Sequence, residues 1–131
     1  MAKERYVHGR HTSAYILLFL AQESAYGLTL LNKMEEQIPH NNIDGSAIYR
    51  ALKDLENSGF VQSYWDTNDP GPAKKWYQIT EAGLQELDEF KTDIEMRVDN
   101  LQFFLRTYQE LFKGSKHEDK KNEDVNLHEK L

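Results

Sequence analysis

The residues of this chain best suited to contact a polyanion share one face of a predicted helix. From about residue 44 to residue 58, apolar side chains recur at the i, i+3, i+4 and i+7 positions, which places them on one buried stripe. That stripe consists of Ile48, Ala51, Leu52 and Leu55. Long side-chain donors on the opposite face of the helix can reach the phosphates or base edges of DNA. A hydroxyl at the start of the helix can approach the floor of the DNA major groove. The expected DNA contacts of this helix are Ser46, Tyr49, Arg50 and Lys53.

Two further cations adjoin a turn-rich segment. Phe60 to Trp65 and Lys75 to Ile79 are rich in β-branched and aromatic residues, which predicts two short strands. The nine residues between them include Pro-Gly-Pro and are too many for a tight hairpin, so we expect a two-stranded ribbon with a projecting loop. Lys74 and Lys75, at the base of this loop, are suited to phosphate contact.

Each of these features also has a plainer interpretation. The helix face is an ordinary solvated surface if Asp54 and Glu56, on the same helix, cancel its positive charge. Lys74 and Lys75 are a solubilising pair if they only protect the edge of a strand.

Catalysis, metals and cofactors are not expected. The chain has no Cys, which excludes a disulfide, a thiolate zinc site and a cysteine nucleophile. Its five His residues show no metal-ligand spacing, and no Gly-rich phosphate loop or nucleophile elbow is present. His8 and His11 are interpreted as part of a basic N-terminal arm rather than as a metal pair.

The net charge of −6 is unevenly distributed along the chain. Residues 1–80 carry eight Lys and Arg against nine Asp and Glu, whereas residues 81–112 carry three against eight, and the remainder balances at five each. The acidity therefore belongs to the second half, where it would face away from a duplex held by the first half.

Four helices are expected to position these groups. Thr12 or Ser13 can cap the first, and the run from Ala14 to Ala21 is apolar on nearly all sides, as in a helix at the centre of a small core. That run is short for a signal-peptide core and far too short to cross a bilayer, so a cytoplasmic protein without a membrane segment is expected. The second helix follows Tyr26-Gly27 and ends before Pro39; its apolar positions are Leu28, Leu31, Met34 and Ile38.

The last helix begins at Thr80 to Ala82 and carries two interleaved seven-residue apolar series, which is the spacing of a coiled-coil seam with Lys91 as its one violation. A second copy of the chain is the expected partner, and a lone helix packed on its own domain is the alternative. The predicted dimerisation residues are Leu87, Ile94, Val98, Leu101, Leu105, Tyr108 and Phe112.

Aromatic residues on the first and last helices are candidates for an effector pocket, although such residues also serve simply as core. The pocket candidates are Tyr15, Phe19, Phe90 and Phe104.

The expected fold is therefore mainly α with a small β-ribbon: a winged helix-turn-helix domain plus one long C-terminal dimerisation helix. Residues 1–80 would form the DNA-binding domain with its N-terminal arm, residues 81–112 the dimerisation helix, and residues 113–131 a flexible charged tail.

The stretch from Tyr15 to Leu87 resembles the PadR family of bacterial regulators. Three blocks in the family's order carry the resemblance: residues 25–27 (Ala-Tyr-Gly), residues 47–56 (Ala-Ile-Tyr-Arg-Ala-Leu-Lys-Asp-Leu-Glu) followed by Gly59, and residues 71–83 (Gly-Pro-Ala-Lys-Lys-Trp-Tyr-Gln-Ile-Thr-Glu-Ala-Gly). Lys74-Lys75-Trp76 departs mildly from the Arg-Lys-Tyr type common in the family.

The resemblance implies a homodimeric repressor on palindromic double-stranded DNA operators, often released by a small aromatic or lipophilic effector. The single last helix is similar to that of the shorter PadR subfamily. A winged-helix module that binds another protein and no DNA is the alternative from a different functional class.

Overall fold

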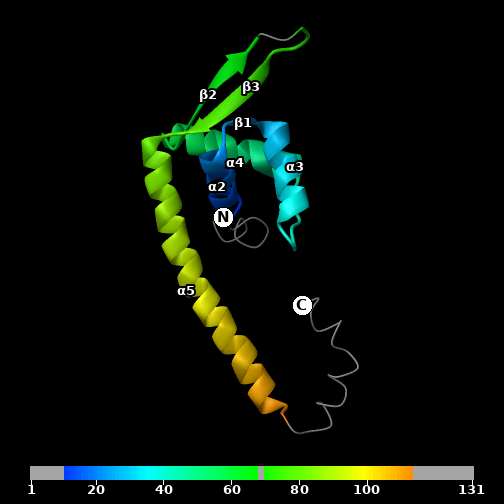
Figure 1. Ribbon diagram of the computed structural model, residues 1–131, viewed down its shortest axis with the longest axis vertical. Coiled ribbons are helices and arrows are strands. Elements are labelled where there is room, and N and C mark those ends of the chain that lie inside the picture. The colour runs from blue at the N-terminus through cyan, green and yellow to red at the C-terminus, as the bar shows by residue number, and fades with distance from the viewer. Residues whose placement is uncertain (1–10, 68–69, 114–131) are drawn as a thin grey trace. The chain divides into compact units, whose positions relative to one another are not determined.

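The computed structural model describes residues 11–67 and 70–113 of the chain. Most of the predicted N-terminal arm, and all but the first residue of the predicted tail, lie outside these residues. The described elements are α2 (Thr12–Gln22), β1 (Ala25–Tyr26), α3 (Gly27–Gln37), α4 (Gly45–Asn57), β2 (Val61–Asp66), β3 (Lys74–Ile79) and α5 (Glu81–Leu111). Their order confirms the predicted winged helix-turn-helix fold, mainly α with a small sheet (Figure 1).

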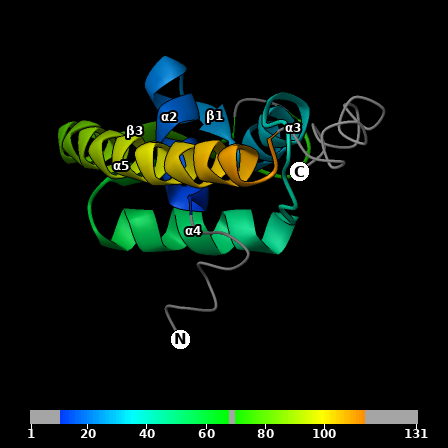
Figure 2. The ribbon, with the colours of Figure 1, turned by 90° about the horizontal axis from the view of Figure 1, so that it is seen from below.

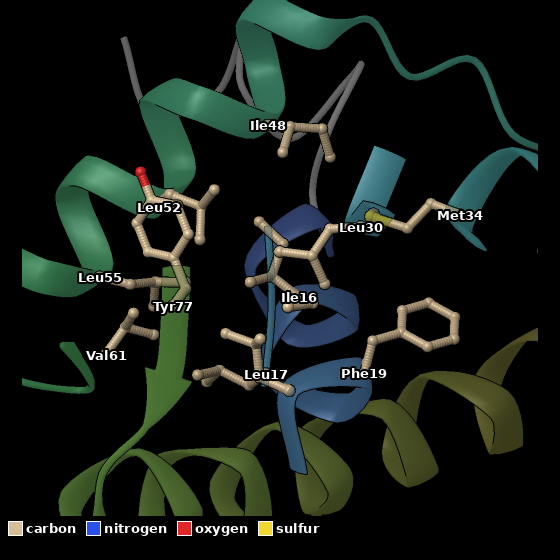
Figure 3. Packing of buried hydrophobic residues seen from close by; sticks show 12 residues of the cluster. Ile16, Leu17, Phe19, Leu30, Met34, Ile48, Leu52, Leu55, Val61 and Tyr77 are labelled. Carbon is tan, nitrogen blue, oxygen red and sulfur yellow. The ribbon is translucent and has the colours of Figure 1, made fainter. Parts of the chain in front are cut away.

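The core lies where α2, α3, α4 and the inner face of the sheet meet (Figure 3). α2 is apolar on nearly all sides, as the sequence predicts for a central helix, and it buries Ile16 and Leu17 completely. Burial of one such side chain stabilises the fold by about 1.5 to 3 kcal/mol. The other side chains that are completely enclosed come from the remaining elements: Leu30, Met34, Ile48, Leu52 and Val61.

α4 begins and ends as its sequence predicts. The Asp44 side chain accepts a hydrogen bond from the Ala47 backbone N–H at 2.8 Å, which satisfies one of the free donors of the first turn. The helix ends at Asn57, and Gly59 follows with φ of +84°, a conformation that glycine adopts without strain. Figure 2 shows α4 running along one side of the first unit.

The sheet has three strands rather than the predicted two. Its order is β1-β3-β2, both pairs are antiparallel, and Tyr26 lies opposite Trp76 across the β1–β3 pair. β1 is only two residues long, too short to show a strand period, so the sequence indicates only a helix break at Tyr26.

Two further expectations about the helices are wrong in detail. Neither Thr12 nor Ser13 caps α2: His11 is the N-cap and makes no side-chain cap hydrogen bond, while Thr12 is the first helical residue and is buried. In α3, Leu28 is 61% exposed, and Leu30 fills the core instead. Gly27, Leu30 and Met34 lie on one face of the helix, and α3 packs with this face toward the core.

α5 begins immediately after β3, as predicted. The Thr80 hydroxyl accepts a hydrogen bond from the Gly83 N–H at 3.0 Å and donates one to the Gly59 carbonyl at 2.7 Å. The chain divides into two compact units, Met1–Lys91 and Thr92–Leu131, and the division falls inside this helix. The first turns of α5 belong to the first unit because Leu87 and Phe90 pack against its core.

Candidate nucleic-acid interface

One face of α4 is open to solvent over its full length. The buried side chains Ile48, Leu52 and Leu55 point into the first unit. The four predicted contact residues recur at i, i+3, i+4 and i+7 on the other side and are all exposed: Ser46, Tyr49, Arg50 and Lys53. Two hydroxyls, a guanidinium and an ammonium are thus presented in one row.

A glycine at the start of α3 gives Tyr49 its position. A Cβ on Gly27 would lie 2.4 Å from Cε1 and 2.7 Å from the hydroxyl oxygen of Tyr49, so any larger residue here would require the ring to shift. The contact places the hydroxyl end of the ring against Gly27 of α3, while 49% of the residue stays exposed. Sequence reasoning interpreted Gly27 only as a helix break and missed this role.

α4 is also linked by polar and aromatic groups to the wing, which is the ribbon formed by β2 and β3. The Ser63 hydroxyl of β2 donates a hydrogen bond to the Glu56 carboxylate of α4 at 2.7 Å. Burial raises the pKa of the neighbouring Tyr77 hydroxyl, and the negative charge of Glu56 raises this pKa further. Glu56 therefore faces the wing, and Asp54 remains as the exposed acid that offsets charge on this helix.

The two wing lysines lie on opposite faces of the ribbon. β2 and β3 pair in register from Val61 opposite Ile79 out to Asp66 opposite Lys74, and successive residues of a strand alternate between faces. Lys74 is exposed, with Nζ 5.3 Å from the centre of the Tyr26 ring. Lys75 is half-buried, with Nζ 5.4 Å from the centre of the Trp65 ring. Each ammonium thus has an aromatic ring within cation–π range.

The base of the wing is braced by β1. The Tyr26 hydroxyl donates to an Asp66 carboxylate oxygen at 2.5 Å, and the Tyr26 ring meets the Trp76 ring edge to face with centroids 4.7 Å apart. These contacts link the short strand to both long strands of the ribbon. The predicted loop between those strands includes residues 68 and 69, which lie outside the described residues.

The predicted dimerisation residues fall into two groups. Leu87 is half-buried and packs against the core of the first unit, and Ile94 is half-buried in the second unit. The remaining members are exposed in the single chain by 36% to 63%: Val98, Leu101, Leu105, Tyr108 and Phe112.

The predicted effector residues lie in both units. Phe19 is 4% exposed and belongs to the core, while Tyr15 and Phe90 are half-buried and pack against its edge. Phe104 belongs to the second unit, is 62% exposed, and stacks on Tyr108 with ring centroids 6.4 Å apart.

The described residues offer neither a membrane-spanning helix nor a cluster of metal ligands. In residues 11–67 and 70–113, no helix is both long enough and apolar enough to cross a membrane. The same residues contain no group of three or more His, Asp or Glu side chains that could hold a metal ion.

Comparison with known proteins supplies independent evidence. Residues 16–89 match the family model described as the transcriptional regulator PadR-like family. The chain is 30% identical to the protein described as conserved protein of unknown function TM0937, a potential transcriptional factor; the match covers 80% of this chain and 93% of that one, with a TM-score of 0.70. No curated protein sequence is similar enough to count as a match.

Two other solved structures share the fold. The putative transcriptional regulator TA0346 from Thermoplasma acidophilum is 27% identical, with a TM-score of 0.67 over 78% of this chain and 96% of that one. A PadR family transcription regulator from Clostridium difficile R20291 is 22% identical, with a TM-score of 0.64 over 72% and 98% of the two chains.

Proposed function

Because the chain belongs to the PadR-like family of transcriptional regulators, we propose that it is a sequence-specific DNA-binding repressor that acts as a homodimer on a palindromic operator. The observation that carries the proposal is the open row on α4, whose hydroxyl and cationic side chains lie opposite the stripe that anchors the helix in the core. The role is regulatory rather than catalytic. It implies action in the compartment that holds the genome, which is the cytoplasm in a prokaryotic cell.

α4 would enter the major groove as the recognition helix. Its diameter with side chains, about 10 to 12 Å, matches the width of that groove. Arg50 would donate to the acceptors of guanine, and Tyr49 and Ser46 would contact bases or phosphates near the helix start. Lys53, one turn beyond Tyr49, would pair with a phosphate.

The wing would supply backbone contacts. Lys74 and Lys75 point to opposite faces of the ribbon, so the two ammonium groups would meet phosphates on different sides of the wing. Phosphate contacts set the register of the protein on the duplex without reading sequence.

The dimer would form through the second half of α5. Five apolar side chains at three- and four-residue spacing are exposed there in the single chain, and a contiguous apolar row of that kind marks an interaction surface. A second copy of the same helix presents the same row, so a two-fold interface would cover both. Two recognition helices would then bind half-sites about 34 Å apart.

Release by a small aromatic or lipophilic molecule completes the proposal. Tyr15 and Phe90 support it because both are half-buried aromatics at the edge of the core. Titration of a panel of such compounds into the operator complex should displace DNA, as followed by fluorescence anisotropy. A panel that leaves the complex intact would limit the proposal to a repressor without such an effector.

Selection of bound fragments from random DNA duplexes tests the central claim. We expect an enriched palindrome, and an affinity that falls steeply with salt because Lys and Arg contacts release counterions from phosphate. A protein that enriches no sequence and binds no duplex at any ionic strength would instead be a winged-helix module for protein partners.

A further inference from the structure

The wing carries an exposed tryptophan that the DNA contacts proposed above do not use. Trp65 is the second-to-last residue of β2, and 61% of it is exposed. Its indole is an apolar plate with a single N–H donor, and its face attracts cations. An exposed ring of this kind on the ribbon can pack against the surface of a molecule that binds there.

The strand register shows which way this ring faces. Val61, Ser63 and Trp65 lie opposite Ile79, Tyr77 and Lys75, so these three pairs share one face of the ribbon. Val61 and Tyr77 are core residues, and Ser63 contacts Glu56 of α4. Trp65 and Lys75 are therefore on the face that packs against α4, one pair further out, about 7 Å beyond the Ser63–Glu56 contact.

Trp65 and Lys75 form a pair of complementary chemistry. The Lys75 ammonium lies 5.4 Å from the centre of the indole, within cation–π range, so the ring holds a positive charge beside its own flat surface. A nucleotide backbone offers the matching groups, because each phosphate adjoins a deoxyribose with an apolar face.

We propose that Trp65 and Lys75 form one backbone-contact site, in which the indole packs on a deoxyribose of the strand bordering the groove that α4 enters, and Lys75 pairs with the adjoining phosphate. The inference rests on the proposed function. Every nucleotide carries the same sugar and phosphate, so the site contributes affinity without sequence preference.

The experiment compares two neighbouring residues of one strand. Trp65→Ala removes the plate, and Tyr64→Ala is the matched control, because Tyr64 is 48% exposed but faces the other side of the ribbon. Trp65→Ala should weaken binding to the operator and to random duplex alike, by about fivefold to tenfold, which corresponds to the loss of one packed ring. Tyr64→Ala should stay within about twofold of the wild type on both DNAs, because it removes no charge and leaves Lys74 as the phosphate contact of that face.

Salt dependence separates the two members of the pair. Trp65→Ala removes no charge, so its slope of log affinity against log salt should equal that of the wild type, whereas Lys75→Ala should lower the slope by about one.

Tryptophan fluorescence reports the contact between Trp65 and DNA directly. Trp65 and Trp76 are the two tryptophans of the chain, so a Trp76→Phe protein leaves Trp65 as the sole indole, and DNA should shield it from acrylamide.

The outcomes separate this inference from the proposed function. A wild-type protein that binds no DNA contradicts the proposed function itself. A wild type that binds while Trp65→Ala, folded by circular dichroism, binds as tightly as Tyr64→Ala overturns the inference alone. A Trp65→Ala variant that loses affinity only for the operator also overturns it, because the indole would then contact a base.

Discussion

Individual side chains on α4 and on the wing should differ in what they contribute to DNA binding. Arg50 and Tyr49 are exposed on the α4 row, where base edges come within reach, whereas Lys75 stands on the ribbon. We expect Arg50→Ala or Tyr49→Ala to weaken operator binding by about 1 to 3 kcal/mol and to blunt sequence preference. Lys75→Ala should weaken operator and random DNA equally. Titration of both DNAs by anisotropy checks this, and wild-type binding by all three folded variants would exclude α4 as the reader.

Gly83, at the start of α5, lies too close to its neighbours to accept a side chain. A Cβ on Gly83 would lie 2.1 Å from the Phe60 carbonyl oxygen and 2.7 Å from Ile79 Cγ1. Backbone cannot move aside as a flexible side chain can, so Gly83→Ala should lower the free energy of unfolding by about 2 kcal/mol or more.

Gly45→Ala is the matched control for that substitution. Its Cβ would meet Leu31 Cδ2 at 3.7 Å, an ordinary contact, and alanine favours the helix that begins there. Urea unfolding should therefore show a lowered midpoint for Gly83→Ala and an unchanged or raised one for Gly45→Ala. Equal midpoints for the two variants would contradict the close-approach argument.

Some of these side chains can be found from the sequence and others cannot. The row on α4 follows from the buried stripe, because the exposed face of a helix lies opposite its apolar positions. The dependence of Tyr49 on Gly27 has no local signal, since it arises from packing between two helices. For Trp65 a signal did exist: the two-residue period from Val61 through Ser63 already places it on the inner face of the ribbon.

Among the elements, α4 depends on its N-cap. The hydrogen bond from the Ala47 N–H holds the pKa of the Asp44 carboxyl below its ordinary value. The folded state therefore favours the charged form: the added stability is present above the unfolded pKa, at about pH 4 and higher, and is lost as pH falls through the folded pKa.

We expect Asp44→Ala to lower the urea midpoint at neutral pH, and the gap from the wild type to narrow as pH falls below about 4, where the charge is lost. Asp44→Asn should keep most of the neutral-pH midpoint, because its amide oxygen still accepts the bond. The difference between the Asn and Ala variants should change little with pH, because neither side chain titrates. An Asp44→Ala midpoint equal to the wild type at pH 7 would show that this cap contributes nothing.

The elements also differ in how far the sequence predicts them. α4 carries a cap, a stripe and a terminal glycine that agree, so its bounds follow from local rules. β1 exists because Ala25 and Tyr26 pair with β3, and two residues have no period of their own. The start of α2 was mistaken because Thr12, a good cap by type, is instead buried within the first turn.

For the whole molecule, charge and apolar surface separate along the chain. Residues 81–112 carry three basic against eight acidic side chains, so α5 is poorly suited to lie on DNA. The same helix exposes its apolar row in the single chain. Repulsion from phosphate and attraction to a second copy both favour α5 as the dimer contact, with α4 and the wing left for the duplex.

The proposed dimer would give a palindromic operator its geometry, and Leu101 tests this proposal. Leu101 lies in the middle of the row and is 63% exposed, so Leu101→Asp should spare the single chain. In a dimer the same substitution would bury a charge in a desolvated contact, at a cost of about 3 kcal/mol or more. Light scattering should therefore show a mass close to the monomer, with operator binding lost and the circular dichroism of the domain retained.

Thr107→Asp adds the same charge to α5 on the side away from the row, and it should leave both the dimer and operator binding intact. Together the two variants separate the position of the charge from its mere presence. If Thr107→Asp and Leu101→Asp dissociate the protein equally, general acidity rather than the row controls assembly. If the wild type is itself a monomer at micromolar concentration, α5 packs on its own domain, and two half-sites would no longer be linked by a single protein.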